Sequence, residues 1–389
     1  MTRHTAVMAS FLFETHVMGA GPTGCMTALA LAQLNQRVVV FDPQASDALT
    51  ARSRAYAITH SSRRLMQRLG LWDELLNDLV AFEQLDLRDL AAGRQVLFLA
   101  DDLALKNRGH SGIGWILDHR PLMTVLLRRL QDSPHVHLHL GGSAAPIPSL
   151  DSLVIAADGP SSPTRESWGI HCWQHRYRQG CLTAKVILRG VQANQACELF
   201  RPEGPLAVLP LGNDQFQVVW SAPMQRCQDR SALPPSEFLD QLAGILPQGI
   251  DPDLLLDQPR AFPQQWMLAR RLSRGRGVLV GEAGHRCHPV GGQGLNLCWR
   301  DVDVLVTSVQ KGGSAKRIAA RYGRQRWIDL ILVGAATDLL VRFFSNKNSL
   351  LVGLRQIALQ LLKSSHRLRQ LSLRAMTDGP MRIARALPD

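Results

Sequence analysis

A glycine-rich segment at residues 280–301 holds the densest group of chemistry-bearing residues in the chain. It reads VGEAGHRCHPVGGQGLNLCWRD and contains five glycines, two histidines, two cysteines and a proline. Such a segment can serve as a metal site, a nucleophile loop or a cradle for a flat or anionic cofactor. The side chains of His285, Cys287 and His288 fall short of the four ligands that a structural zinc site uses. Because the chain also lacks the GxSxG motif of a serine hydrolase, we interpret the segment as a cofactor cradle.

The cradle interpretation uses each residue type in this segment. Glu282 ends an apolar strand pattern, where its carboxylate can accept hydrogen bonds from ribityl hydroxyls, and Pro289 can press on a flat ring. Three glycines allow a close approach of the backbone: Gly291, Gly292 and Gly294. A helix that begins near residues 293–296 would point its amides and its positive dipole end at the ligand. For a flavin, this end would stabilise negative charge on the reduced ring.

A second glycine motif lies near the N-terminus. An apolar strand pattern ends at Met18, and an Ala/Leu-rich helix pattern and a second strand pattern follow, the latter ending in Asp42. The turn between strand and helix has the GxGxxG spacing, with glycines at Gly19, Gly21 and Gly24. In this context the motif predicts a dinucleotide site, with the pyrophosphate at the helix N-terminus and the acidic side chain on the adenosine ribose.

The remaining patterns predict a nucleotide-binding domain that is interrupted by a second domain. SLVIAADGPSSPTR places a turn at Asp158-Gly159 directly after a strand, with Arg165 beyond it. Between residues 171 and 268 the apolar residues alternate with polar ones and with turn residues, as in antiparallel sheets. Seven cysteines without a CxxC pair indicate reduced thiols in the cytoplasm. The first residues have neither the length of apolar run nor the cleavage site of a secretory leader.

The positive charge is concentrated in the last part of the chain. Of the net +12, residues 311–389 contribute most, with 15 Lys and Arg against 4 Asp. Apolar residues recur there at helical spacing: Leu350, Leu351, Leu354, Ile357, Ala358, Leu361 and Leu362. With Arg355, Lys363, Arg367 and Arg369 nearby, this pattern is typical of a basic amphipathic helix on a membrane surface, or of an ordinary packed helix with a solvated basic face. Aromatic residues are too sparse to favour nucleic acid.

Three motifs together resemble one family. GAGPTG, ADGPSSPTR and GEAGHRCHPVGGQGLNLCWRDV are similar to the motifs of single-component flavoprotein monooxygenases related to p-hydroxybenzoate hydroxylase. Within that group, HPVGGQGLNL, EGPLAVLPL and TDLLVRFFSN resemble the ubiquinone-biosynthesis hydroxylases, nearest to the 2-polyprenyl-6-methoxyphenol hydroxylase branch. The likeness runs from about residue 13 to the end.

The resemblance implies an α/β fold and a set of site residues. A Rossmann-like, glutathione-reductase-like FAD-binding domain would comprise residues 12–75, 109–170 and 269–330, an antiparallel-sheet substrate domain 76–108 and 171–268, and a C-terminal helical region 331–389. The implied FAD-binding residues are Gly19, Gly21, Gly24, Asp42, Arg54, Asp158, Gly159, Glu282, Pro289, Gly291, Gly292, Gln293, Gly294, Leu295 and Asn296. His288 and Pro289 are the catalytic candidates, and no metal is expected. The family's acid is Asp where Glu282 stands.

The implied reaction is aromatic-ring hydroxylation. NADH or NADPH reduces the FAD, O₂ gives a flavin C4a-hydroperoxide, and one oxygen atom passes to a polyprenyl phenol on the way to ubiquinone. The expected location is cytoplasmic and peripheral, with the basic C-terminal region on the inner membrane or on other quinone-biosynthesis enzymes, and without nucleic acid. Three alternatives stay open: a hydroxylase of a small soluble aromatic, a flavin-linked prenyl reductase, and a non-catalytic accessory protein of quinone biosynthesis.

Overall fold

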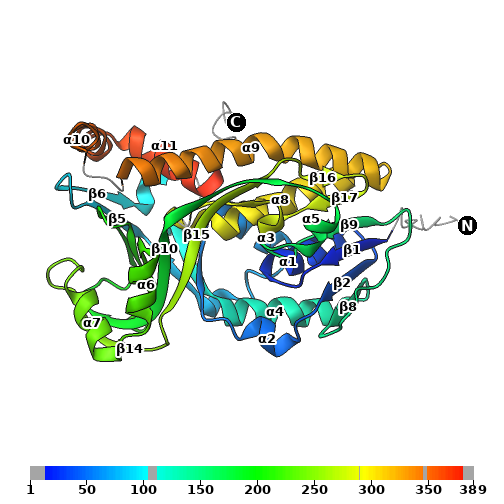
Figure 1. The fold of residues 1–389 in the computed structure, drawn as a ribbon, viewed down its shortest axis with the longest axis horizontal. Coiled ribbons are helices and arrows are strands. Elements are labelled where there is room, and N and C mark those ends of the chain that lie inside the picture. Colours follow the sequence, from blue (N-terminus) through cyan, green and yellow to red (C-terminus); the bar gives the residue numbers. More distant parts are fainter. Residues whose placement is uncertain (1–13, 104–111, 289, 345–347, 380–389) are drawn as a thin grey trace, which may run out of the picture.

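The computed structural model describes residues 14–103, 112–288, 290–344 and 348–379 (Figure 1). Pro289 therefore lies outside the described residues. All seven cysteines are free thiols.

A six-stranded sheet forms the centre of the nucleotide-binding part. Its strand order is β16-β17-β9-β1-β2-β8, and all neighbours are parallel except β16 and β17. The strands are β1 (Thr15–Met18), β2 (Val38–Asp42), β8 (Val136–Leu140), β9 (Leu153–Ala156), β16 (Ser273–Arg274) and β17 (Gly277–Leu279). The central strands β1 and β9 consist almost entirely of buried residues, as expected for a parallel sheet covered on both faces.

Helices from distant parts of the sequence cover this sheet. They are α1 (Pro22–Ala32), α2 (Ser46–Thr50), α3 (His60–Arg68), α4 (His119–Gln131), α5 (Pro163–Ser167) and α8 (Gln293–Gln310). Helix α1 is apolar all round and is buried on every side, which is typical of a core helix. A small antiparallel sheet, β3 (Ala55–Ile58), β7 (Gly114–Asp118) and β4 (Leu79–Phe82), lies beside them.

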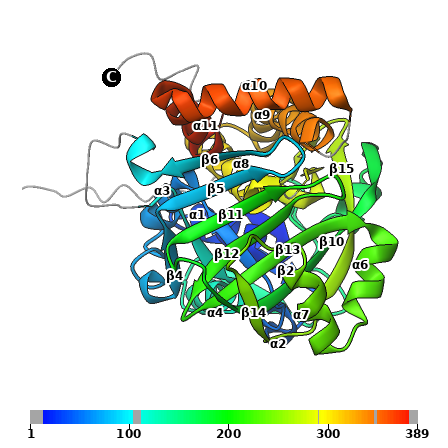
Figure 2. The ribbon, with the colours of Figure 1, turned by 90° about the vertical axis from the view of Figure 1, so that its left-hand side faces the viewer.

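A nine-stranded, mostly antiparallel sheet forms the second layer (Figures 1 and 2). It consists of β5 (Gln84–Asp89), β6 (Arg94–Leu99), β10 (Cys172–Arg189), β11 (Gln195–Phe200), β12 (Leu206–Gly212), β13 (Gln215–Pro223), β14 (Asp251–Leu255), β15 (Arg260–Ala269) and β18 (His285–Arg286). Helices α6 (Met224–Ser231) and α7 (Pro235–Ala243) pack on its outer face through Cys227, Phe238 and Leu242. The long strands β10 and β15 reach from this sheet to the six-stranded one (Figure 1).

Three helices follow at the C-terminal end: α9 (Ala315–Phe344), α10 (Ser349–Ser364) and α11 (His366–Asp378). They lie together along one edge of the molecule (Figure 1). Short 3-10 turns complete the chain: η1 (Leu76–Asp78), η2 (Ala100–Leu103), η3 (Gly281–Ala283) and η4 (Val290–Gly292). No helix in the described part of the chain is long and apolar enough to span a membrane.

The predicted fold class is confirmed: a Rossmann-like α/β unit, a largely antiparallel sheet and a helical C-terminal region. The predicted domain boundaries stay predictions. Helix α9 runs without a break across residues 330 and 331, where one of these boundaries falls.

Candidate functional site

The first glycine turn is packed tightly on one side and open on the other. A Cβ atom on Gly24 would lie 1.9 Å from the carbonyl oxygen of Gly19, and one on Gly19 would lie 2.4 Å from that of Ala157. Gly19 also has φ +103°, which other residues rarely adopt. A Cβ atom on Gly21, in contrast, would meet nothing within 4 Å. The open backbone at the N-terminus of α1 fits a pyrophosphate.

Asp42 connects the end of β2 to this turn. It is buried, and its carboxylate accepts hydrogen bonds from the backbone N–H of Ala20 and of Gln44, each at 2.8 Å. Because a carboxylate oxygen can accept more than one hydrogen bond, both oxygens retain capacity for ribose hydroxyls.

The turn at Asp158-Gly159 is held by hydrogen bonds from the start of α5. Asp158 accepts hydrogen bonds from the Ser162 hydroxyl and from the backbone N–H of Thr164, the latter at 3.0 Å. Gly159 has φ +86°. Buried Arg165 donates to the carbonyl oxygens of Pro160 and Ala283, both at 3.0 Å. This arginine therefore joins the turn to η3, a role that its sequence position alone does not indicate.

The third loop lies against the first. A Cβ atom on Gly281 would lie 2.8 Å from the Thr23 side chain, so η3 and the start of α1 are in contact. Glu282 is part-buried, and Arg286 approaches it at 3.9 Å. Burial raises the pKa of Tyr56, the nearby Glu282 carboxylate raises it further, and Arg54 opposes the rise. Glu282 and Arg54 therefore both lie near Tyr56.

The buried side chain of Asp301 holds the loop at η3 in place. The sequence patterns did not identify Asp301 as a site residue. Its fully buried carboxylate accepts hydrogen bonds at 2.7 Å from the backbone N–H of Gly281, from His285 Nε2 and from Arg326 Nε. Burial by itself would raise the pKa of Asp301, but His285, Arg326 and these hydrogen bonds hold it below its ordinary value. The available signal was the acidic residue inside the helical pattern after the glycines.

The N-terminus of α8 completes the site. Gly291 and Gly292 have φ +68° and +62°, and a Cβ atom on Gly292 would lie 2.8 Å from that of Ala57 in β3. A Cβ atom on Gly294 would meet nothing within 4 Å. The first-turn amides of α8, on Gln293, Gly294 and part-buried Leu295, lie beside this open surface.

The side chains of the α8 N-terminus bind protein groups. Asn296 donates to the carbonyl oxygens of Ala57 (2.7 Å) and Gly292 (2.9 Å). Its Oδ1 accepts from Thr59 and from Ser62 (2.6 Å). Gln293 Nε2 donates to the carbonyl oxygens of Gly291 and Met376, both at 3.1 Å. Because these two side chains are engaged with protein groups, a ligand at the N-terminus of α8 would meet mainly the backbone of Gln293 and Asn296.

His288 is fully buried beside Tyr177, with the two rings edge to face at 5.4 Å. Burial lowers the pKa of His288 to about 4, against a small opposite effect of Asp338. Its imidazole is therefore neutral at pH 7.

Arg54 lies between the two layers of the molecule. Its guanidinium is 5.2 Å from the Tyr56 ring centroid, and its carbonyl oxygen accepts a hydrogen bond from the His119 N–H at 2.8 Å. Burial raises the pKa of Cys181 on β10, whereas Arg54 acts in the opposite direction. Arg54 is thus near the inner face of the large sheet.

The structure brings the three motifs and strand β3 together. Contacts between Gly19 and Ala157, Thr23 and Gly281, Arg165 and Ala283, and Asn296 and Ala57 join them in one place. Two open glycine backbones at helix N-termini, with acidic side chains nearby, fit FAD: Gly21 at the pyrophosphate and Gly294 at the ring end. Individual contacts to FAD stay predictions. In the described residues, no group of three His, Cys, Asp or Glu is arranged to hold a metal ion.

This fold and site define a flavoprotein of the FAD-dependent monooxygenase class. The FAD binding domain family matches residues 13–84 and 151–326, more than half of the chain, and the protein belongs to this family.

Named relatives are hydroxylases. Ubiquinone hydroxylase UbiL of Rhodospirillum rubrum is 30% identical, and the match covers 96% of this chain and 92% of the relative. The 3-demethoxyubiquinol 3-hydroxylase of Escherichia coli is 28% identical, covering 86% and 90%. The crystal structure of p-nitrophenol 4-monooxygenase PnpA from Pseudomonas putida has the same fold, with a TM-score of 0.74, 18% identity, and coverage of 93% of this chain and 96% of that chain.

Proposed function

We propose that this protein hydroxylates the aromatic ring of a polyprenyl phenol in ubiquinone biosynthesis, with NADH or NADPH as electron donor and O₂ as the oxygen source. The relatives named for ubiquinone hydroxylation support the substrate class. The observation that carries the proposal is the continuity between the site and an apolar surface. Gly292 touches Ala57, and Ala57 packs on an apolar cluster that includes Leu87 and Leu209 of the large sheet.

The reaction divides between cofactor and protein. Bound FAD supplies the redox chemistry that delivers one oxygen atom of O₂ to the ring. The chain must hold the phenol ring beside the flavin and exclude water, and the apolar inner face of the large sheet meets both needs. The neutral imidazole of His288 is fully buried beside Tyr177, so it adds no charge there.

The direct test is turnover with matched phenols. Purified protein with FAD is given NADH or NADPH and either a short-chain prenylated phenol or the same phenol without its chain. We expect prenyl-dependent NAD(P)H oxidation and a product heavier by one oxygen atom. Equal turnover of the unprenylated phenol would favour a hydroxylase of small aromatics, and a reduced prenyl chain would favour a prenyl reductase. Bound FAD without any product would favour an accessory protein.

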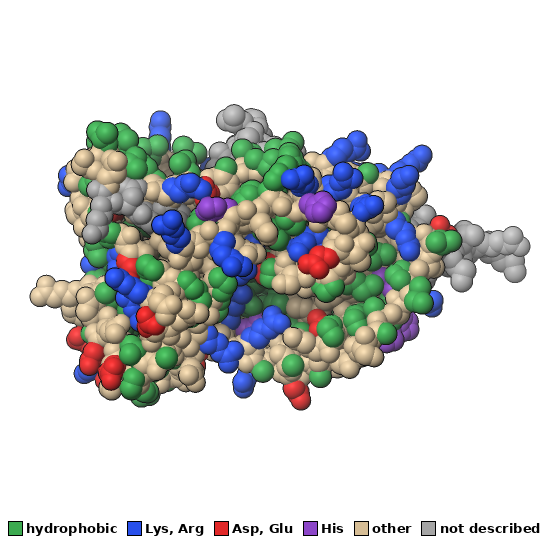
Figure 3. Space-filling model, viewed as in Figure 1, with side chains coloured by type: hydrophobic (Ala, Val, Ile, Leu, Met, Phe, Trp, Pro, Cys, Tyr) green, Lys and Arg blue, Asp and Glu red, His purple; other side chains and the backbone are tan. Residues whose placement is uncertain are grey.

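We also propose that helices α9–α11 dock on an anionic membrane surface. On α10, Leu350, Leu354, Ile357 and Leu361 lie on one face and are 53–78% exposed. On α9, Ile328, Leu332 and Leu339 are also exposed. Figure 3 shows hydrophobic side chains along this edge, with Lys and Arg around them.

Four arginines lie near the exposed apolar side chains of α9. Arg270, Arg271, Arg274 and Arg324 line two adjacent hollows of about 290 and 520 Å³ at the base of α9, beside Trp327 and Ile328. In the part of the chain that the structure describes, none of these four is within 4.0 Å of a carboxylate. Charge complementarity therefore favours acidic phospholipid headgroups. Arg355, one of the predicted basic residues of this region, is an exception: it is fully buried, and its Nε lies 3.2 Å from Asp89 Oδ2.

Vesicle flotation tests the docking. We expect the FAD-loaded protein to float with anionic vesicles, to be released by salt, and to lose binding when Leu354 and Ile357 are both changed to Glu. The control is Leu254→Glu, at a 52% exposed leucine on β14. Flotation that is insensitive to salt and equal in all variants would overturn the proposal.

A further inference from the structure

Glu198 is a carboxylate on the inner face of the large sheet that has no hydrogen-bond or ion-pair partner among the described residues. Along β11 the side chains alternate, so that Cys197 and Leu199 join the cluster under α6 and α7 while Ala196 and Phe200 join the opposite cluster. Glu198 shares the face of Ala196 and Phe200. Its neighbours across the strands are Leu87 of β5 and Ala207 of β12.

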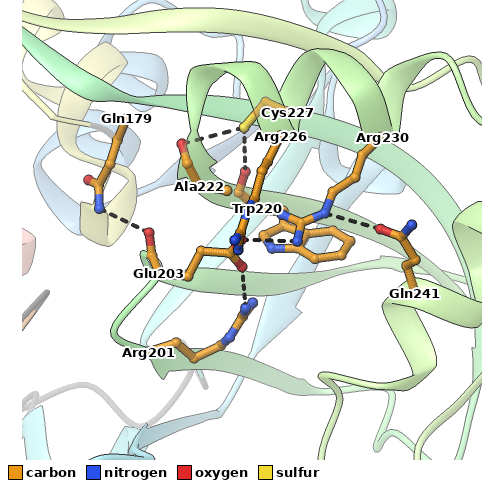
Figure 4. Close-up of polar contacts among 9 residues, drawn as sticks. All are labelled: Gln179, Arg201, Glu203, Trp220, Ala222, Arg226, Cys227, Arg230 and Gln241. Carbon is orange, nitrogen blue, oxygen red and sulfur yellow. Dashed lines mark hydrogen bonds and ion pairs between the residues drawn. The ribbon is translucent and has the colours of Figure 1, made fainter.

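The environment of Glu198 contrasts with that of the other nearby glutamate. Glu203, on the outer side, accepts hydrogen bonds from Arg201 (2.6 Å), Arg226 (2.8 Å) and Arg230 (3.0 Å) (Figure 4). Among the described residues, no donor or cation pairs with Glu198. Burial is the one cause that raises the pKa of Glu198 to about 7. Glu198 is part-buried, and a carboxylate removed from water without a partner is costly, so such groups gather at functional sites.

The charged groups on the neighbouring strands are already paired. On β5, Asp86 points to the outer face and lies 2.6 Å from Arg88. Asp89, on the inner face beside Phe200, lies 3.2 Å from Arg355 of α10. Cys197, next to Glu198 in the chain, points to the outer face. The two carboxylates of β5 are thus each paired with an arginine.

The inner face leads to the glycine segment at the start of α8. Ala196 and Phe200 belong to the same cluster as Leu209 of β12 and Ala57 of β3. Ala57 in turn is in contact with Gly292 at the start of α8. Glu198 therefore faces the space in which the proposed function places the aromatic ring.

We propose that Glu198 is the catalytic base that accepts the proton of the phenol hydroxyl. The inference rests on the proposed function, because it takes a phenol as the substrate. The phenolic O–H bond breaks, its electron pair stays on the oxygen, and the proton forms an O–H bond with the Glu198 carboxylate. The resulting phenolate is more electron-rich at its ring carbons, as oxygen transfer to the ring requires. The proton returns to solvent after the product leaves.

The test combines turnover with a readout of ionisation. A fluorinated phenol is bound to the oxidised FAD enzyme without NAD(P)H, and its ionisation is followed by ¹⁹F NMR against pH. In the wild type we expect the affinity for the phenol to rise through about pH 7, where Glu198 loses its proton and can accept the phenolic hydrogen bond, with a matching step in the ¹⁹F shift of the bound ring. In Glu198→Gln this step should vanish, and product formation should fall roughly 100-fold or more. Glu198→Asp should restore the step in part.

Controls separate this inference from the proposed function. Glu237→Gln, on the exposed surface of α7, should leave both readouts unchanged. Folding is checked by FAD content and thermal unfolding, and if Glu198→Gln is unstable, Glu198→Asp carries the comparison. An unchanged ¹⁹F step and unchanged turnover in Glu198→Gln would overturn the assignment while leaving the hydroxylase proposal intact. A Glu198-dependent ¹⁹F step in an enzyme that hydroxylates no prenylated phenol would support the base and refute the substrate.

Discussion

Glu282 and Asp301 act on the same loop in different ways. Glu282 presents a part-buried carboxylate near Tyr56, whereas Asp301 holds the Gly281 amide from inside the core. Substitution of Glu282 should therefore change the affinity for FAD, and substitution of Asp301 should change the stability of the fold.

Glu282→Ala should weaken FAD binding. The loss of a hydrogen bond between a ligand and a charged group costs about 1.5–3 kcal/mol, which corresponds to roughly 10- to 100-fold in affinity. Glu282→Asp should keep FAD bound or tighten it. Equilibrium dialysis measures both, with Glu237→Ala as a surface control. An unchanged affinity in Glu282→Ala would show that this loop does not bind the ribityl chain.

Asp301→Asn should lower the free energy of unfolding by about 3–5 kcal/mol, because it removes the buried carboxylate that pairs with Arg326 and His285 and leaves Asp329 as the remaining carboxylate partner of Arg326. Urea unfolding of the FAD-free protein measures the change. Asp303→Asn on the same helix, whose partner Arg68 is exposed, should cost less than about 1 kcal/mol.

The Asp301 pair also predicts a pH dependence. The folded-state pKa lies below the unfolded value, so the stabilisation is complete above the unfolded pKa of about 4 and is lost as the pH falls through the folded one. Asp301→Asn should therefore unfold with a weaker dependence on pH between about 5 and 2. Equal acid dependence in both proteins would contradict this account.

In the β1–α1 unit, one glycine is needed for folding and another is open for the cofactor. Gly24→Ala places a methyl group against the Gly19 carbonyl and should destabilise the apoprotein by about 1–3 kcal/mol or more. Gly21→Ala meets no protein atom within 4 Å, so it should leave apoprotein stability within roughly 0.5 kcal/mol and still reduce FAD affinity. Thermal unfolding with and without FAD distinguishes the two. Full FAD affinity in Gly21→Ala would place the pyrophosphate elsewhere.

At the scale of the whole molecule, the C-terminal helices are part of the folded unit. Phe344 of α9 stacks on Phe200 of β11 at 4.2 Å, and Gln293 of α8 donates to Met376 of α11. Buried Arg355 joins α10 to Asp89 of β5 and donates to the Phe344 carbonyl oxygen at 2.7 Å. The helices thus contact both the start of α8 and the large sheet.

Arg355→Ala should destabilise the molecule by about 3–5 kcal/mol, because it leaves Asp89 buried without its cation. Since α10 and the sheet unfold together, we expect a single urea transition at a lower midpoint. Exposed Arg367→Ala on α11 is the matched control and should change the free energy of unfolding by less than about 0.5 kcal/mol. A separate early transition in Arg355→Ala would indicate that the helices unfold independently of the sheet.

Local features of this chain follow from its sequence alone. The turn from Gly19 to Gly24, the acidic end of β2 at Asp42 and the helical spacing along α10 follow from backbone sterics and from short-range periodicity, which any such stretch displays wherever it lies in the chain. The fold class followed from the order of these elements. The position of Glu282 after a strand was also visible.

Which distant residues meet depends on the fold of the whole chain. Asp301 with His285 and Arg326, Arg165 with Ala283, and Arg355 with Asp89 are pairings across loops or domains that no local pattern specifies. The same is true of the surroundings of a charge: Arg355 of the basic helix is enclosed, whereas Glu198 lies part-buried on an apolar sheet face without a partner among the described residues. The cost of burying a charge depends on what the rest of the chain places around it, and that is fixed only when the chain folds.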